Sequence, residues 1–303
     1  MKTLKLANLD ESVLAALDFF SLNQPPRLNL KKFSFPIIVG SGNAYNTGLL
    51  IFSDRPAVVA NESNFKNILR SYQPLIKNKN LTQAIIISAS GEKDSIWEIK
   101  LAKKSGLKTT LLTCNANSRA AKIADEVLTY QKLPEPYTYN TSTYLGMILG
   151  ASGEKTATIK KYIQSLKLPN NFKNYSAYSF ILPDKFGPVA PMLEIKRNEL
   201  FGPYLSLRAF SFGEARHAKF VNNWDKELII SFGENKYFGA QKNRWEIKLP
   251  KKIGPALIMA LSYYLIGKIQ ESKTPYFKKN IKKFCQEGPK AYGSKKSFPI
   301  IVQ

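Results

Sequence analysis

The stretch AIIISASGEKDSIWEIKLAKKSG, residues 84–106, decides how the first half of the chain folds. Ala84 to Ile87 are apolar and mostly β-branched, which is typical of a strand buried on both faces. A small polar turn, Ser88-Ala89-Ser90-Gly91, follows, and apolar residues then recur at helical spacing as far as Gly106. N–H groups at a helix start attract anions, and serine hydroxyls add donors. The stretch indicates either a phosphate site or an ordinary strand-to-helix turn, where Ser and Gly are common anyway.

The same pattern occurs earlier, where the apolar residues 36–39 lead into the glycine-rich turn 40–44 and a predicted helix to residue 52. This G-x-G lacks the third glycine and the later acidic residue of a dinucleotide fingerprint. Alternating strands and helices predict a parallel sheet with helices on both faces. Ligands bind such sheets beyond the carboxyl ends of the strands, so turns 40–43 and 88–91 are expected to lie together. Further strands are predicted at 57–60, 109–113 and 127–130, and helices at 9–21, 65–75 and 118–124.

Composition limits the class of protein. The chain has 303 residues, 44% of them hydrophobic, which is enough for one large domain or two ordinary ones. No apolar run approaches the roughly 20 residues that span a bilayer, and the N-terminal residues make a poor signal peptide. Two distant cysteines, Cys114 and Cys285, form neither a disulfide framework nor a metal site. We therefore predict a cytoplasmic protein without membrane contact, metal or cofactor.

The net charge of +23 admits two interpretations. A polyanionic partner is one of them, because basic patches bind nucleic acids. The lysines are scattered in pairs along the sequence, however, and no helix-turn-helix or RNP-like motif is present. A solvated basic surface is the better interpretation, and no specific nucleic acid is expected as a partner.

The second half repeats the alternation less clearly. Residues 151–174 are polar and are expected to connect two similar halves, with strands at 175–182 and 227–232. The second of these strands ends in Gly233-Glu234-Asn235 without serines, so this half is predicted to lack an anion site. Residues 253–269 form the most apolar predicted helix, which suits a core or a dimer interface.

Two residues of the second half are candidates for proton transfer. A predicted helix beginning at residues 188–190 carries Glu199, and the segment 213–217 ends in His217, the single histidine. A carboxylate can remove a proton from the carbon next to a carbonyl, and a histidine suits proton transfer to a ring oxygen near neutral pH. On these residues alone, the alternative is favoured: Glu199 in a surface ion pair and His217 in a capping or packing role.

A family resemblance changes that balance. The succession VGSGNAYNTGLL, IISASGEKDSIWEIKLAKKSGLKTTLLTCN and IADEVLTY resembles a sugar isomerase (SIS) domain over about residues 33–150. That family binds its phosphosugar with a glycine-serine turn after the first strand and an S-x-S-G turn after a later one. This chain has a lysine where the family usually has a threonine. The resemblance implies a phosphate site made of Ser41, Gly42, Ser88, Ser90, Gly91 and Lys93.

The segment PVAPMLEIKRNELFGPYLSLRAFSFGEARHAKF is similar to the isomerase domain of glucosamine-6-phosphate synthase and to archaeal phosphoglucose/phosphomannose isomerases. The resemblance implies that Glu199 is the catalytic base and that His217 opens the sugar ring in the neighbouring subunit. It also implies that Ser142, Thr143 and Glu214 bind substrate. The chain departs from the pattern in two ways: the spacing from Glu199 to His217 is about two residues longer, and segment 134–147 has no basic residue.

Together these observations predict an α/β protein with two SIS-like subdomains. Each is expected to be a parallel five-stranded sheet flanked by helices, an αβα sandwich of flavodoxin-like type. The expected boundaries are 1–32 for an N-terminal helical extension, 33–150 for the first subdomain and 151–303 for the second with C-terminal helices. The implied function is a homodimeric aldose–ketose isomerase of the glucose-6-phosphate or mannose-6-phosphate type, working through an enediol. The alternative is a non-catalytic phosphosugar-binding SIS protein.

Overall fold

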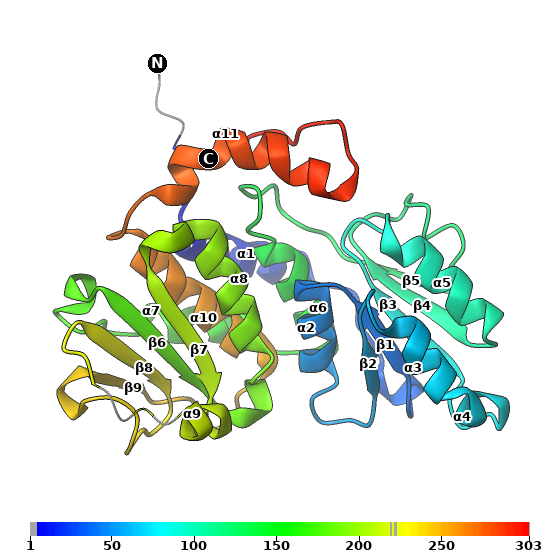
Figure 1. Ribbon diagram of the computed structural model, residues 1–303, viewed down its shortest axis with the longest axis horizontal. Coiled ribbons are helices and arrows are strands. Elements are labelled where there is room, and N and C mark those ends of the chain that lie inside the picture. The colour runs from blue at the N-terminus through cyan, green and yellow to red at the C-terminus, as the bar shows by residue number, and fades with distance from the viewer. Residues whose placement is uncertain (1–4, 219, 221–222, 303) are drawn as a thin grey trace. The chain divides into compact units, whose positions relative to one another are not determined.

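The structure is a computed structural model that describes residues 5–218, 220 and 223–302 (Figure 1). Its chain divides into two compact units. One consists of residues 19–133 and 142–155, and the rest of the described chain forms the other, so that segment 134–141 belongs with the later part of the chain. We call these the serine-turn unit and the carboxylate unit, after the candidate site that each carries.

The serine-turn unit contains a five-stranded parallel sheet in the order β2-β1-β3-β4-β5. The strands are β1 (Ile37–Gly40), β2 (Val58–Ala60), β3 (Gln83–Ile87), β4 (Lys108–Thr113) and β5 (Glu126–Thr129). The helices are α2 (Asn43–Ile51), α3 (Phe65–Ser71), α4 (Gln73–Lys77), α5 (Asp94–Lys104) and α6 (Thr141–Ser152, the first residue of which lies in the other unit), with a short 3₁₀ turn η1 (Leu30–Lys32).

The central strands of this sheet are buried on both faces, as their sequence predicts. Side chains alternate along β1 and β3, so Val39 and Ile86 pack beneath α3, α4 and α5 in one apolar core. On the opposite face, α2 approaches so closely that a Cβ atom on Gly48 would lie 2.7 Å from Ile38. Helices therefore cover both faces of the first sheet, and the three-layer prediction is confirmed here (Figure 1).

The carboxylate unit contains a four-stranded parallel sheet in the order β7-β6-β8-β9. The strands are β6 (Ala177–Leu182), β7 (Ser206–Ser211), β8 (Glu227–Phe232) and β9 (Arg244–Ile247). The helices are α1 (Leu9–Leu22, the last residues of which lie in the other unit), α7 (Thr156–Gln164), α8 (Val189–Phe201), α9 (Phe212–Ala218), α10 (Pro255–Gln270) and α11 (Tyr276–Glu287). Short 3₁₀ turns are η2 (Phe172–Asn174), η3 (Asp184–Phe186), η4 (Gly202–Tyr204), η5 (Gln241–Asn243) and η6 (Gly288–Tyr292).

The predicted fifth strand of the second sheet is absent from the described residues. After β9 the sequence continues as Lys248-Leu249-Pro250-Lys251-Lys252 and enters α10 at Pro255. Such a short basic stretch containing proline has no apolar run to pair with β9. The expectation of two five-stranded sheets is therefore corrected for the second half.

Two helix predictions for the first half also need correction. Residues 118–124 form successive turns, with Ser118 Oγ accepting a hydrogen bond from the Ala121 N–H at 3.2 Å. Serine hydroxyls compete for backbone groups in this way and favour turns over helices. The helix predicted over 65–75 is divided at Tyr72 into α3 and α4, because Pro74 starts a new helix there.

Candidate functional site

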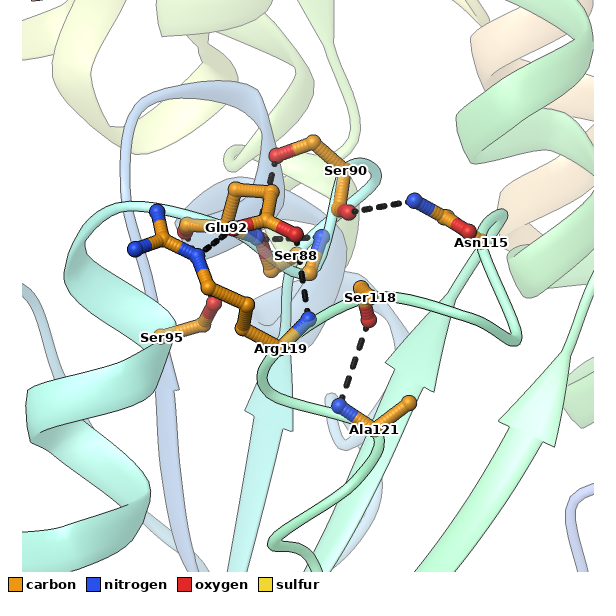
Figure 2. A network of polar contacts seen from close by, with 9 residues as sticks. Ser88, Ser90, Glu92, Ser95, Asn115, Ser118, Arg119 and Ala121 are labelled. Atoms are coloured by element: carbon orange, nitrogen blue, oxygen red, sulfur yellow. Dashed lines mark hydrogen bonds and ion pairs between the residues drawn. The ribbon is translucent and has the colours of Figure 1, made fainter.

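The turn after β3 is closed by its own serines (Figure 2). The Gly91 N–H donates to the Ser88 carbonyl and to Ser88 Oγ, both at 3.2 Å. The Glu92 N–H donates to Ser90 Oγ at 3.3 Å. In both contacts the hydroxyl oxygen is the acceptor, so each serine keeps its hydroxyl hydrogen for another acceptor such as a phosphate oxygen.

A glycine is required at position 91. Its φ is +62°, and a Cβ atom there would lie 2.1 Å from Ser118 Oγ, which belongs to the turns after β4. The same turns hold the Ser90 carbonyl, which accepts from Asn115 Nδ2 at 3.4 Å (Figure 2). The S-x-S-G motif is thus fixed by close packing against a segment about 27 residues later in the chain.

Glu92 also contacts that segment. Its carboxylate accepts from Arg119 Nε at 2.5 Å and from the Arg119 N–H at 3.0 Å. The hydrogen bonds from the Arg119 backbone and side chain hold the pKa of Glu92 below its usual range. Glu92 is therefore an ionised structural clamp on the turn.

The glycine-serine turn after β1 lies beside this one. Gly40 and Ile87 are paired in the parallel register of β1 and β3, so Ser41 and Ser88 follow at the same edge of neighbouring strands. Gly42 has φ +55° and begins α2, and Asn43 beyond it is 9% exposed. The structure thus brings together the two turns in which the sequence places phosphate-binding residues.

Lys93 completes the predicted phosphate set, in an unusual conformation. It is the N-cap of α5 with φ +57°, a region that residues with a Cβ atom rarely adopt. Partial desolvation lowers its pKa. Strained backbone of this kind concentrates at functional sites.

In the carboxylate unit, Glu199 is held by a buried lysine. Lys196 is on the same helix, α8, and its Nζ lies 2.7 Å from Glu199 Oε2. The Lys196 side chain is 0% exposed and that of Glu199 is 27% exposed. Lys196 Nζ also donates to the Thr138 carbonyl and lies 5.7 Å from the centre of the Tyr263 ring. Glu199 is therefore a partly exposed carboxylate with a fully desolvated cation behind it.

Segment 134–141 contacts this pair through Thr138. Thr138, whose carbonyl accepts from Lys196, has φ +76°, a strained value for a β-branched residue. Burial raises the pKa of Tyr137, and the charges of Tyr292 and Glu199 add to the shift. The Tyr137 ring packs against Phe298 with centroids 5.1 Å apart. The strained backbone of Thr138 and the Tyr263 ring thus contact Lys196, and Tyr137 is close enough to Glu199 to be affected by its charge.

Lys196 was not among the predicted site residues. The family resemblance implies a cation in segment 134–147, which has none here, whereas the cation beside Glu199 comes from α8 itself. Residues three apart lie on one helix face, so the spacing of Lys196 and Glu199 was the available signal. By contrast, Glu194 pairs at 3.4 Å with Arg197, which is partly exposed, so the cation beside Glu194 is less buried than the one beside Glu199.

Glu214 and His217 lie at the other end of β7. Glu214 Oε2 accepts from the Ser211 N–H at 2.8 Å, while the Glu214 N–H donates to Ser211 Oγ at 3.2 Å. This reciprocal pair is a capping box at the start of α9. His217 is exposed near the end of that short helix. Glu199 precedes β7 and His217 follows it, and the six residues of the strand separate its ends by about 17 Å.

Ser142 and Thr143 are both buried in α6 of the serine-turn unit, at 0% and 1% exposure. Ser142 Oγ accepts from the Leu133 N–H at 3.0 Å. Their predicted contact with substrate stays a prediction.

Among the described residues no group of three or more His, Cys, Asp or Glu side chains is arranged to hold a metal ion. Nor does any helix in this part of the chain have the length and apolarity needed to cross a bilayer.

Several solved structures have the same fold as most of this chain. One is a putative phosphosugar isomerase from Clostridium difficile 630, with TM-score 0.59 and 15% identity over 88% of this chain and 92% of that one. Another is the C-terminal domain of glucosamine-fructose-6-phosphate aminotransferase from Francisella tularensis, with TM-score 0.58 and 14% identity over 87% and 93%. The fold is that of the sugar isomerase proteins. Tagatose-6-phosphate ketose/aldose isomerase from Escherichia coli shares the SIS fold at TM-score 0.56, with 13% identity over 88% and 92%.

Sequence comparison adds one relative. The chain is 31% identical over 122 residues to the glutamine–fructose-6-phosphate aminotransferase (isomerizing) of Pyrococcus horikoshii. The match covers 38% of this chain and spans only 20% of that protein's length. No family model matches the sequence. The predicted resemblance to SIS isomerases is thus confirmed, including that to the glucosamine-6-phosphate synthase domain.

Proposed function

We propose that the chain is an aldose–ketose isomerase for a hexose phosphate of the glucose-6-phosphate or mannose-6-phosphate type. The observation that carries this proposal is the Lys196–Glu199 pair, in which a buried ammonium fixes a partly exposed carboxylate. The same fold occurs in phosphosugar isomerases, and the serine turns after β1 and β3 offer hydroxyl donors for a phosphate.

In the proposed reaction Glu199 takes the proton from C2 of the open-chain sugar and returns it to C1. Between these steps the substrate is an enediol, and one proton passes between the oxygens on C1 and C2, so atoms and charge balance. A general base of this kind contributes typically about 10² to 10⁴-fold to the rate. Lys196 holds Glu199 in one orientation and offsets its charge.

His217 is proposed to open the ring of the substrate bound to a second copy of the chain. Glu199 lies on α8 before β7 and His217 on α9 after it, and the two ends of β7 are about 17 Å apart. A hexose ring is much shorter than this strand. This length therefore supports a homodimer in which His217 of each copy reaches the active site of the other copy.

A second candidate, a non-catalytic phosphosugar-binding protein, is favoured by Lys93. A lysine stands where SIS domains usually have a threonine, and its backbone has a positive φ of 57° that a residue with a Cβ atom rarely adopts. Such a protein keeps the serine turns and has no turnover.

Exchange of the substrate C2 proton with solvent deuterium, followed by NMR, separates these candidates. The wild-type protein should exchange the proton with a hexose phosphate that it binds. Glu199→Gln keeps the shape and removes the base, so exchange should fall at least about 100-fold. Glu194→Gln, on the same helix, is the matched control and should keep exchange. Binding without exchange in the wild type would establish the non-catalytic alternative, and equal exchange in Glu199→Gln would exclude Glu199 as the base.

A further inference from the structure

Glu98 is a buried acid on α5 that neither the phosphate site nor the proton-transfer site uses. It is 2% exposed, and its Oε1 has no hydrogen-bond partner among the described residues. No ion pair to Glu98 is present in the described part of the chain either. A buried, unpaired carboxylate costs stability, so its presence calls for a physical explanation.

The position of Glu98 on α5 places it below the serine turn. It follows Asp94, the first residue of the helix, by four residues, which is about 6 Å along the axis. Side chains on a helix lean toward its N-terminus, so the Glu98 carboxyl group leans toward the turn that ends at Lys93. Ser95, one turn earlier, donates its hydroxyl to the Glu92 carbonyl at 2.8 Å and does not serve Glu98.

The two charged groups that act on the pKa of Glu98 are both acidic. Asp94 comes from its own helix and Glu62 from the turn before α3, and both act on it as carboxylates. On α3, Lys66 lies over the Trp97 ring, 5.6 Å from its centre. The turn above contributes Glu92, which is clamped by Arg119, and Lys93. The underlying strands β1 and β3 carry no titratable side chain.

We propose that Glu98 makes anion binding at the serine turn proton-linked, so that a bound phosphate or sulfate ester group is accompanied by uptake of a proton on Glu98. This proposal rests on the phosphate site of the proposed function. An anion at the turn is repelled by an ionised Glu98 through the protein interior, where charges are screened less than in water. Protonation removes the repulsion, and the neutral acid is also cheaper to bury.

The expected consequence is weaker binding in alkaline solution. Burial, with Asp94 and Glu62 adding to it, raises the pKa of Glu98 from 4.5 to about 7. Below pH 7 the acid is neutral and binding is unaffected by it. Above pH 7 it is ionised in the free protein, and the anion must bind against its charge or bring a proton with it. Glu98 is thus a positioning residue, because it acts through the charge of the site without contact to the anion.

Sulfate tests this inference because it does not titrate between pH 6 and 8.5, whereas a phosphate monoester does. We expect the affinity of the full chain for sodium sulfate, measured by calorimetry at constant ionic strength, to fall about tenfold from pH 6 to 8.5, which corresponds to a shift of one pKa unit on binding. Glu98→Gln mimics the neutral acid and should bind equally at both pH values. Glu126→Gln, a carboxylate of β5 paired with Lys108, is the matched control and should keep the wild-type profile.

A second measurement uses the wild-type protein alone. The heat of sulfate binding at pH 7 in buffers of different ionisation enthalpy should reveal net proton uptake, which Glu98→Gln abolishes. Binding at pH 6 with a flat profile and no proton uptake would overturn the linkage and leave the phosphate site standing. No binding of sulfate or glucose 6-phosphate at pH 6 would overturn the phosphate site, and the linkage with it.

Discussion

Gly42 and Lys93 have the same positive-φ backbone conformation at the N-caps of α2 and α5. The angles are φ 55° and ψ −121° at Gly42, and φ 57° and ψ −119° at Lys93. Type II′ turns reserve this conformation for glycine, because it brings a Cβ atom too close to the backbone. The two turns at the edge of the first sheet are thus built alike, and only one has the residue that suits the geometry.

Replacing Lys93 with glycine should therefore stabilise the protein. Relief of strain should stabilise the folded protein by about 1 to 3 kcal/mol. The greater conformational freedom of glycine in the unfolded chain should destabilise it by about 0.5 to 1 kcal/mol. We expect a net gain of about 1 kcal/mol in the free energy of unfolding, measured with urea. Lys100→Gly, at an exposed position inside α5, is the control and should lose about 1 kcal/mol. Equal losses in both variants would show that Lys93 is unstrained.

Ser90→Ala should weaken binding of a hexose phosphate by about 1 to 3 kcal/mol, the range for a hydrogen bond to a charged group. The hydroxyl oxygen accepts from the Glu92 N–H at 3.3 Å and keeps its hydrogen for the ligand. Calorimetric titration measures the change. Ser105→Ala, at the other end of α5, removes a hydroxyl that donates to the Leu101 carbonyl at 3.0 Å, and should leave affinity unchanged. Unchanged affinity in Ser90→Ala would exclude Ser90 as a ligand.

Glu98 should also set the dependence of stability on pH. Its pKa is raised from 4.5 to about 7 in the folded protein, so the folded state binds more protons between these values. Stability contributed by the neutral acid is therefore present below pH 4.5 and is lost as pH rises to 7. The loss is about 3 kcal/mol at most. Urea unfolding at pH 4.5 and 8 should show Glu98→Gln gaining stability over wild type only at pH 8. Equal differences at both pH values would contradict the buried, unpaired state of Glu98.

The sequence identified elements whose pattern is local. Residues 227–232 were predicted as a strand and form β8 with those bounds, because six consecutive buried positions suit a central parallel strand. β7 was missed because its six residues form neither a continuous apolar run nor a regular alternation, and Arg208 within it pairs with Glu227 at 2.5 Å. That partner lies on another strand, so local periodicity does not report it.

The residues of the candidate site likewise differ in whether a local sequence pattern or a contact between distant residues reveals them. Ser88, Ser90 and Gly91 were identified from a strand-turn-helix pattern that is contained within 23 residues. The role of Arg119 in clamping the turn, and of segment 134–141 in holding Lys196, depends on contacts between distant parts of the chain. Glu98 escaped notice because a charged residue within a helix is normally exposed. Tertiary packing alone makes it a buried acid.

The last prediction concerns the separation of Glu199 from His217. If each copy of a dimer lends its histidine to the other, two inactive variants should restore activity when they share a dimer. Glu199→Gln supplies an intact His217, and His217→Ala supplies an intact Glu199. A mixed dimer then has one site with both groups and one with neither. Random exchange of equal amounts gives half mixed dimers, so about a quarter of wild-type turnover should return.

The mixture should be unfolded and refolded together, or co-expressed, and assayed by exchange of the substrate C2 proton against each variant alone. The matched control is a chain with both substitutions, Glu199→Gln and His217→Ala, mixed with wild-type chain. In its mixed dimers each site has one defective group. That mixture should give about a quarter of wild-type turnover, from the wild-type dimers alone. Sedimentation must show a dimer under the assay conditions. Recovery in the first mixture, where neither variant has activity alone, requires sites shared between copies. A dimer that shows no recovery would place the ring-opening group elsewhere than His217 of the second copy.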